Sequence, residues 1–232
     1  MNLHEQIVNG KGYAVLPIEN IKNFSKLKDL FMDKMRAFTE EKKIEKVRLV
    51  MSSMTKSQIN ELMVSLLSFD RASEILAESC KNIVKELSGE EIFLQRRANT
   101  IFNLPNKNHR RQWPHYELMS GISPFTYGLW APLHDLDDND GVFYKDLDQS
   151  YDLIKEEKKY GVVNGPIILN KKYEEKPIKL KYGEVIVFSP FVLHGNVGFE
   201  SKLTRIATSA RFQSIKKPLF QKDSDFFKFY KI

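Results

Sequence analysis

The sequence predicts an α+β protein in which N-terminal helices pack against strands that close into a double-stranded β-helix, or jelly roll. Two observations support this fold class. Apolar residues recur every three or four positions between Ile21 and Leu87, which is typical of amphipathic helices. From Glu91 onwards the apolar period falls to two, which is typical of strands. We therefore expect a helical section followed by a strand-rich one.

The 232 residues are expected to form a single domain, because strand-rich chains of this length commonly do. Residues 1–90 would supply an N-terminal strand and a helical support, and residues 91–213 the jelly-roll core. Within this core, residues 142–181 are expected to form an insertion or lid, since long polar loops in compact domains are usually functional. Residues 214–232 would form a C-terminal tail.

Composition places the chain among globular proteins, because hydrophobic residues make up 42% of it and aromatic residues 12%. The net charge of +6 favours anionic partners, but basic and acidic residues alternate along most segments. A nucleic-acid-binding surface, which needs clustered Lys and Arg, is therefore not expected. Only KKPLFQK near the C-terminus approaches such a cluster, and a solvated tail is the favoured interpretation.

Neither disulfide bonding nor membrane insertion is predicted. Cys80 is the only cysteine, so no intrachain disulfide can form. No run of about 18 apolar residues occurs, and the first residues lack the apolar stretch of a signal peptide. We expect a cytoplasmic protein without a membrane partner.

The N-terminal section begins with a short helix over residues 3–8 and a strand, YAVLP, that ends at Pro17 and joins the edge of a sheet. The apolar positions that follow fall into three groups, at 27–38, 59–67 and 75–87, and predict three helices. No histidine occurs between Ile21 and Leu87. This section is therefore interpreted as structural scaffold.

The run EIFLQRRANTIFNLP, which starts at Glu91, alternates over its whole length and predicts one strand with Gln95, Arg97 and Asn99 on the same face. Two adjacent arginines on a strand point to opposite faces, so one of them would face inward. A buried charge needs a partner. An ion pair at the rim of the sheet is the favoured interpretation, and a contact to a substrate carboxylate is the alternative.

Two distant stretches contain a candidate set of metal ligands. In WPHYE, His115 and Glu117 are two residues apart, so on an extended segment their side chains leave the backbone on the same side. The strand-like stretch GEVIVFSPFVLHGN brings His194. Two imidazoles and one carboxylate on one side of an ion, with the other side free, are typical of non-haem Fe(II) oxygenases.

His134, in the segment HDLDDND, is the rival ligand. Its neighbour Asp135 is adjacent and therefore points away from it on a strand. The segment is rich in oxygen ligands for Ca²⁺, but it lacks the spacing and terminal Glu of an EF-hand loop. We interpret His134 as a structural residue or as a support to the ligands.

An arginine follows the distal histidine. Arg205 lies eleven residues after His194 on the strand-like run LTRIATSARF, where alternation places it on one face with Ala207, Ser209 and Arg211. A guanidinium group matches the two oxygens of a carboxylate. Arg211 would point into the same cavity, toward a co-substrate or substrate, or would pair with an acid at the far end of the sheet.

The sequence resembles the Fe(II)/2-oxoglutarate-dependent oxygenases, and most of all their phytanoyl-CoA dioxygenase-like branch. The resemblance is carried by HYE, by GEVIVFSPFVLHGN and by the arginine eleven residues after His194. The resemblance covers about residues 92–213. It implies a cupin-like jelly roll in which His115, Glu117 and His194 bind Fe(II). The C5 carboxylate of the co-substrate 2-oxoglutarate would be bound by Arg205, and O₂ would be the second co-substrate. Glu in place of the commoner Asp is a permitted variant.

The match departs from the family at one position. Ala207 stands where some members have a serine that contacts 2-oxoglutarate, and either Ser209 or Thr204 is expected to replace it. Within the insertion, we name Tyr144, Tyr151, Tyr160 and Asn164 as candidate substrate contacts.

The resemblance implies hydroxylation of a small or carrier-linked metabolite, coupled to conversion of 2-oxoglutarate to succinate and CO₂. The segments PLHD and HGN resemble those of bacterial family members associated with surface-carbohydrate biosynthesis. This resemblance favours an anionic or sugar-containing substrate in carbohydrate or secondary metabolism. A metal-dependent cupin isomerase or epimerase and a non-catalytic jelly-roll binding protein are the alternatives. The aromatic tail FFKFYKI is expected to pack on the helical section or on a second subunit, so that the protein is a monomer or a homodimer.

Overall fold

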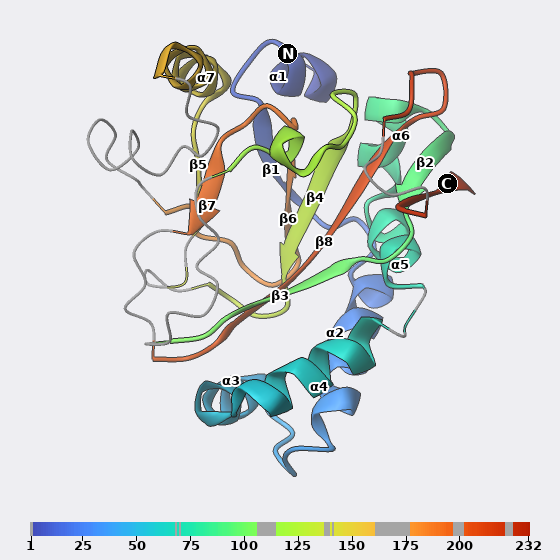
Figure 1. The fold of residues 1–232 in the computed structure, drawn as a ribbon. Coiled ribbons are helices and arrows are strands. Elements are labelled where there is room, and N and C mark those ends of the chain that lie inside the picture. The colour runs from blue at the N-terminus through green and yellow to red at the C-terminus, as the bar shows by residue number, and fades with distance from the viewer. Residues whose placement is uncertain are drawn as a thin grey trace.

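The computed structural model of the chain describes residues 2–67, 69, 71–105, 115–136, 140, 142–160, 177–196, 202–220 and 225–232. Helices and strands follow one another in a helical first section and a strand-rich second section (Figure 1). In chain order they are α1 (Leu3–Val8), β1 (Tyr13–Pro17), α2 (Ile21–Met35), α3 (Ile44–Ser53), α4 (Lys56–Leu67), α5 (Ala72–Ser79), α6 (Lys81–Ser88), β2 (Glu91–Gln95), β3 (Asn99–Asn103), the 3-10 helix η1 (Glu117–Ser120), β4 (Tyr127–Pro132), β5 (Val142–Tyr144), α7 (Leu147–Tyr160), β6 (Glu184–Phe188), β7 (His194–Asn196), β8 (Arg205–Ser214) and β9 (Phe227–Lys231).

The strands form two antiparallel sheets. The larger sheet has the order β1-β6-β4-β8-β2-β9, with β3 paired to β8, and the smaller sheet consists of β5 and β7. Strand β8 is ten residues long and pairs with β4, β2 and β3, so it lies at the centre of the larger sheet. As predicted, β1 lies at the edge of that sheet, where it pairs with β6.

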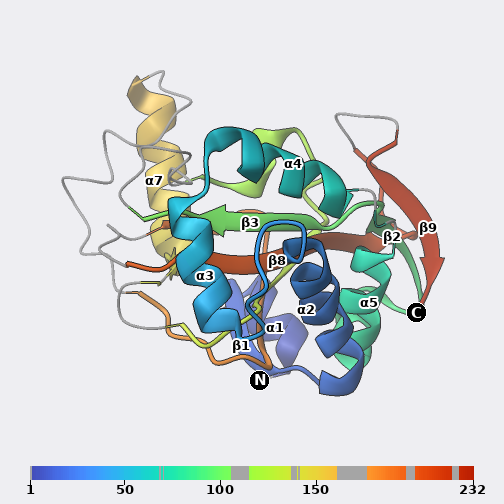
Figure 2. The same cartoon turned by 90° about the horizontal axis from the view of Figure 1, so that it is seen from below.

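Alternation along the central strands separates two cores. On β6, Val185 and Val187 belong to the core shared with the helices, whereas Ile186 and Phe188 face the smaller sheet. Helices α2, α3, α4 and α5 cover the helical side, where Figure 2 shows them lying over β8 and β3. The inner face of β8 is therefore free to carry polar side chains toward the smaller sheet.

The helical section contains more helices than its periodicity predicts. Between residues 21 and 88 the structure has five helices where three were predicted, because α3 was missed and the third predicted helix divides at Cys80 into α5 and α6. Cys80 has φ −122° and ψ 37°, which is not a helical conformation, and it interrupts the helix there. Helix α3 buries Ile44, Val47 and Met51, but intervening charged residues obscure this short pattern.

The alternating run after Glu91 also divides, into β2 and β3. Leu94 pairs with Phe212 of β8, and Asn99 pairs with Ser209. Two more residues separate Leu94 from Asn99 than separate their partners on β8. The chain therefore bulges at Arg96 and Arg97. Arg96 pairs with Asp225 at 2.8 Å and Arg97 is exposed. The prediction of an inward arginine is wrong. An ion pair does lie at the rim of the sheet, but Arg96 forms it, and not an inward-facing Arg97 as predicted.

The segment predicted as an insertion begins inside the jelly roll. Residues 142–144 form β5, which pairs with β7 in the smaller sheet, so the boundary at residue 142 is wrong. The same segment contains helix α7. Residues 161–176, including Asn164, and the side chain of Tyr160 lie outside the described residues, and the lid stays a prediction.

The C-terminal tail contains strand β9, which the sequence did not predict. It pairs with β2 and reaches α5, where Lys228 contacts Glu74 and Tyr230 contacts Glu78. Packing of the tail on the helical section is thus confirmed. None of the described helices is long and apolar enough to cross a membrane.

Candidate metal centre

The two predicted histidine ligands lie directly opposite each other. The backbone N–H of His115 donates to the carbonyl oxygen of His194 at 2.9 Å, and that of His194 donates to the carbonyl oxygen of His115 at 3.1 Å. Opposed residues of an antiparallel pair project their side chains on the same side. The two imidazole rings therefore lie close together, with their centroids 4.3 Å apart.

The third predicted ligand, Glu117, reaches the same point by a turn of the chain. The backbone is extended at Tyr116 (φ −103°, ψ 146°), but Glu117 starts the 3-10 helix η1 and does not continue a strand. Its carboxylate is buried, and Oε1 lies 3.5 Å from His194 Nε2. One ligand atom from each of His115, Glu117 and His194 lies within 4.8 Å of the others, and no other such group of His, Cys, Asp or Glu occurs among the described residues.

Helix α7 supports both ligand segments from behind. Leu153 packs against Tyr116 and Leu193, which are the neighbours of the ligands in the chain. The Tyr116 hydroxyl donates to the carbonyl oxygen of Ser150 at 3.3 Å, and Ser150 Oγ accepts from the backbone N–H of Leu193 at 3.0 Å. The helix that the sequence assigned to an insertion therefore fixes the backbone of the centre.

Hydrogen bonding directs one nitrogen of His194 toward the cluster. Its Nδ1 lies 3.0 Å from the carbonyl oxygen of Val192, which can only accept, so Nδ1 carries the proton in this contact. Nε2, the atom nearest Glu117, then has the free lone pair that a metal requires. The ring of Tyr144 stacks on the His194 imidazole at a centroid distance of 5.2 Å and an angle of 9°.

Arg211 holds the carboxylate of Glu117. Its Nε and Nη2 both contact Glu117 Oε2. Arg211 therefore points into the cavity, as one of the two alternatives predicted, but there it pairs with an acid, the candidate metal ligand Glu117, and the predicted acid at the far end of the sheet is wrong. Burial raises the pKa of Glu117, but the opposing interactions, of which the positive charge of Arg211 is the largest, lower the pKa overall to about 2. The carboxylate is therefore ionised, as a metal ligand must be.

Gln95, at the end of β2, fixes Arg211 in turn. Its Oε1 accepts from the backbone N–H and from Nη1 of Arg211, both at 3.1 Å. Its Nε2 donates to the carbonyl oxygen of Arg97 at 2.7 Å and to Asn99 Oδ1 at 3.2 Å. This support was not predicted from the sequence, although alternation marked Gln95 as a polar residue on one face with Asn99.

His134 is a structural residue, as predicted. Its Nδ1 donates to the carbonyl oxygen of Asp135 at 2.7 Å, and its Nε2 accepts from the backbone N–H of Ile206 at 3.1 Å. Burial and the positive charge of Arg48 lower the pKa of His134 to about 3, so the ring is neutral. Both ring nitrogens are engaged, which leaves neither for a metal.

Arg205, at the start of β8, is fully buried. Its Nη1 donates to the carbonyl oxygen of Asp140 at 3.1 Å, and its Nη2 donates to Asn196 Oδ1 at 2.5 Å. The guanidinium group lies 5.4 Å from the ring centroid of Trp130. Burial lowers the pKa of Arg205 to about 10, so the group remains a cation at neutral pH.

A cavity of about 40 Å³ adjoins the three candidate ligands. Ser209 and Arg211 line this cavity, and Ala207 belongs to the core that faces the smaller sheet. The predicted inner face of β8 is therefore confirmed. Thr204, in contrast, points toward α3, where its Oγ1 lies 3.1 Å from Ser52 Oγ. Of the two alternatives to the missing serine, Ser209 is therefore the one that reaches the cavity.

Aromatic side chains form much of the remaining cavity wall: Trp130, Tyr144 and Phe188. Tyr144 was named as a substrate contact in an insertion, but it belongs to the wall of the centre itself. The other two were not identified from the sequence. The signal for Phe188 was its place in the apolar strand that leads to His194.

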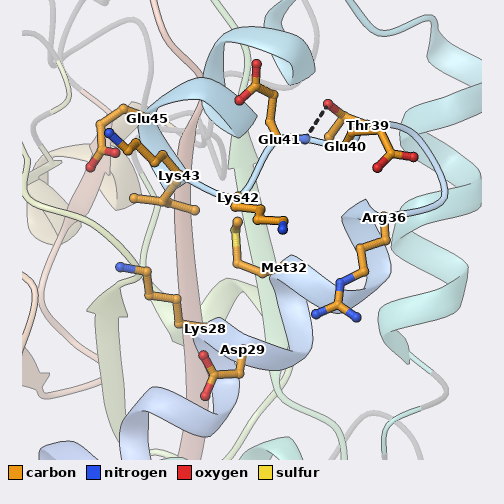
Figure 3. A pocket seen from close by; sticks show the side chains of 11 residues that line it. Lys28, Asp29, Met32, Arg36, Thr39, Glu40, Glu41, Lys42, Lys43 and Glu45 are labelled. Carbon is orange, nitrogen blue, oxygen red and sulfur yellow. Dashed lines mark hydrogen bonds between the residues drawn. The ribbon is translucent and has the colours of Figure 1, made fainter.

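Larger hollows exist, but they contain none of the candidate ligands. The hollow of about 610 Å³ in Figure 3 lies beside α2 and the segment before α3. Its charged lining consists of the basic residues Lys28, Arg36, Lys42 and Lys43 and the acidic residues Asp29, Glu40, Glu41 and Glu45. Opposite charges balance there, so size alone does not locate the chemistry in this protein.

No protein-family model matches the sequence, and a search of curated proteins found no significant match. Solved structures do match. The non-heme monooxygenase ThoJ in its apo form has a TM-score of 0.58 and 13% identity, over 92% of this chain and 77% of that chain. The non-heme alpha ketoglutarate dependent epimerase SnoN, from nogalamycin biosynthesis, has a TM-score of 0.50 and 14% identity, over 91% and 79%. HygX from Streptomyces hygroscopicus, with nickel and 2-oxoglutarate bound, has a TM-score of 0.54 and 10% identity, over 93% and 87%.

At such low identity these matches establish the fold. The chain shares its fold with these solved structures, one named as an alpha ketoglutarate dependent epimerase and one with 2-oxoglutarate bound, which confirms the predicted jelly-roll fold class. The resemblance seen in the sequence is thus confirmed as a likeness of fold. The phytanoyl-CoA dioxygenase-like branch stays a prediction.

Proposed function

We propose that the protein is a non-haem Fe(II)- and 2-oxoglutarate-dependent oxygenase that acts on a small molecule. The observation that carries this proposal is the convergence of His115, Glu117 and His194 beside a cavity within this fold. Two imidazoles and a carboxylate form the donor set that suits Fe(II). The ionised carboxylate and the free Nε2 of His194 satisfy the protonation states that metal binding requires.

Arg211 would limit how Glu117 binds the ion. Two of its nitrogens contact Oε2 of the carboxylate, whereas Oε1 faces His194. A carboxylate held in this way has one oxygen available to a metal. If Glu117 bound the ion through this one oxygen, the three protein ligands would leave room on the ion for co-substrates, as an oxygenase requires.

Arg205 and Ser209 are the proposed contacts for 2-oxoglutarate. Arg205 is a buried cation on the same face of β8 as the cavity, and Ser209 lines the cavity. The cavity volume of about 40 Å³ is far below the roughly 300–1,000 Å³ that is typical of small-molecule sites. We propose that 2-oxoglutarate enters as the contact between Arg205 and Asn196 opens, since a carboxylate is the stronger acceptor.

When bound, Fe(II) and 2-oxoglutarate supply the oxidising chemistry, in which O₂ is consumed and succinate and CO₂ are released. The protein contributes position and the exclusion of water. Trp130, Tyr144 and Phe188 surround the cavity with apolar surface, and the stacking of Tyr144 fixes the plane of the His194 ring.

Hydroxylation of a small or carrier-linked metabolite is the proposed outcome. An anionic or sugar-containing substrate, in carbohydrate or secondary metabolism, is supported by the net charge of +6 and by the PLHD and HGN segments. Epimerisation is the second candidate, because SnoN shares the fold and is named as an epimerase. A monomer or homodimer and a cytoplasmic location are also proposed.

The proposal is tested by adding Fe(II) and 2-oxoglutarate to the protein without oxygen. We expect a visible charge-transfer absorption that needs both components and is lost in His194→Ala. On admission of O₂, succinate should form, and a metabolite panel then separates the outcomes: a product that gains an oxygen atom indicates hydroxylation, and a stereoisomer of the substrate indicates epimerisation. A wild-type protein that binds Fe(II) but gives no absorption with 2-oxoglutarate would instead favour a metal-dependent isomerase without co-substrate.

A further inference from the structure

We propose that Arg48, on helix α3, is a positioning residue that sets Arg205 for 2-oxoglutarate; this inference rests on the proposed function. Arg48 lies in the section that was interpreted as scaffold, yet it is only 5% exposed and faces the start of β8. Its Nε donates to the carbonyl oxygen of Thr204 at 2.8 Å, and its Nη2 forms an ion pair with Asp140 Oδ2. Both partners are connected to Arg205: Thr204 precedes it in the chain, and Asp140 accepts a hydrogen bond from it.

The first connection is through the backbone. Thr204 immediately precedes Arg205, and α3 holds it at several atoms. Besides the Arg48 contact, the backbone N–H of Thr204 donates to Ser52 Oγ at 3.1 Å, and Ser52 Oγ also lies 3.1 Å from Thr204 Oγ1. Helix α3 therefore fixes the backbone position from which the Arg205 side chain leaves.

The second connection is through the guanidinium group. Asp140 binds Arg48 with its side chain and accepts from Arg205 Nη1 with its carbonyl oxygen at 3.1 Å. Asp140 is fully buried. Arg48 therefore fixes Asp140, which in turn orients the guanidinium group of Arg205.

The ion pair between Arg48 and Asp140 also affects how strongly Arg205 can bind the carboxylate of 2-oxoglutarate. While Asp140 is paired with Arg48, its carboxylate is neutralised next to Arg205. Without Arg48, this buried carboxylate loses that guanidinium partner and competes with the carboxylate of 2-oxoglutarate for Arg205. The expected defect is weaker binding of 2-oxoglutarate, with the metal ligands left intact.

The test compares wild type with Arg48→Met by anaerobic titration. Fe(II) affinity is measured first, and 2-oxoglutarate affinity then follows from the charge-transfer absorption. We expect the Kd for 2-oxoglutarate to rise at least about tenfold, as typical for loss of a supporting contact, with Fe(II) affinity unchanged within about twofold. Under turnover, KM for 2-oxoglutarate should rise by the same factor while kcat at saturation is retained.

Three further variants separate positioning from folding. Arg36→Met is the matched control, because Arg36 is 79% exposed and pairs only with Asp33 among the described contacts, so its removal should leave the Kd unchanged. Arg48→Lys keeps the charge but cannot reach both partners with a planar fork, and should give an intermediate Kd. Adding Asp140→Asn to Arg48→Met removes the competing carboxylate and should restore part of the affinity.

The outcomes distinguish this inference from the proposed function. If wild type forms no absorption with Fe(II) and 2-oxoglutarate, the proposed function and this inference fail together. If wild type forms it and folded Arg48→Met has an unchanged Kd, or loses Fe(II) and 2-oxoglutarate affinity equally, only the role of Arg48 is overturned. Should Arg48→Met not fold, Arg48→Lys decides by the same criteria, because it retains the charge.

Discussion

Replacing Arg211 with Met tests the electrostatics of the centre in the metal-free protein. Arg211 is the main group that lowers the pKa of Glu117 from 4.5 to about 2. At about 1.4 kcal/mol per pKa unit, this shift corresponds to roughly 3 kcal/mol of stability. Removal of one partner from a buried ion pair costs about 3–5 kcal/mol. We therefore expect Arg211→Met to lower the free energy of unfolding by about 3 kcal/mol at neutral pH.

The same reasoning predicts how that loss depends on pH. Because the pKa of Glu117 is lowered on folding, its stabilisation is complete above pH 4.5 and is lost as the pH falls toward 2. The difference between wild type and Arg211→Met should therefore narrow over that interval. Urea unfolding followed by circular dichroism, with a chelator present, measures the difference at each pH.

Arg96→Met is the control for this experiment. Arg96 pairs with Asp225 at the rim of the sheet, where the two side chains are 42% and 65% exposed. Exposed pairs contribute about 0–1 kcal/mol, so this variant should change little. The reasoning is refuted if Arg211→Met costs no more than Arg96→Met, or if its cost is the same at pH 7 and pH 3.

Three other substitutions test single assignments. His115→Ala should abolish Fe(II) binding, measured by metal content after dialysis; retention of stoichiometric iron contradicts its role as a ligand. Arg205→Ala should chiefly raise the KM for 2-oxoglutarate, and an unchanged KM shows that the co-substrate binds elsewhere. His134→Leu leaves the backbone N–H of Ile206 without its acceptor and should cost about 1–3 kcal/mol in urea unfolding. Because both nitrogens of His134 are already engaged, Fe(II) binding should persist, and its loss would falsify the structural role of His134.

Part of the candidate ligand set was predictable because its signals are local. Imidazole and carboxylate chemistry is a property of the residue types, and the two-residue spacing of His115 and Glu117 needs only a short extended segment. Alternation on β8 likewise placed Ser209 and Arg211 on one face before any partner strand was known. The part of the site that depends on one segment at a time was therefore accessible from the sequence.

The supports of the site were not predictable in the same way. Gln95 reaches Arg211 because β2 and β8 pair and the chain bulges after Gln95, and neither event leaves a clear pattern in the sequence. Arg48 was hidden in a helix whose apolar pattern is short and interrupted by charges. In both cases the partner lies far along the chain, so no local period can indicate it.

The sequence by itself determined the division into a helical and a strand-rich section, the inner face of β8 and the donor atoms available to a metal. These follow from backbone periodicity and side-chain chemistry, which act over a few residues. Only the tertiary structure decided which charges meet: Arg211 with Glu117, and Arg48 with Asp140. A buried charge takes the partner that chain folding brings within hydrogen-bonding distance, and that distance is set by the packing of the whole jelly roll against its helices.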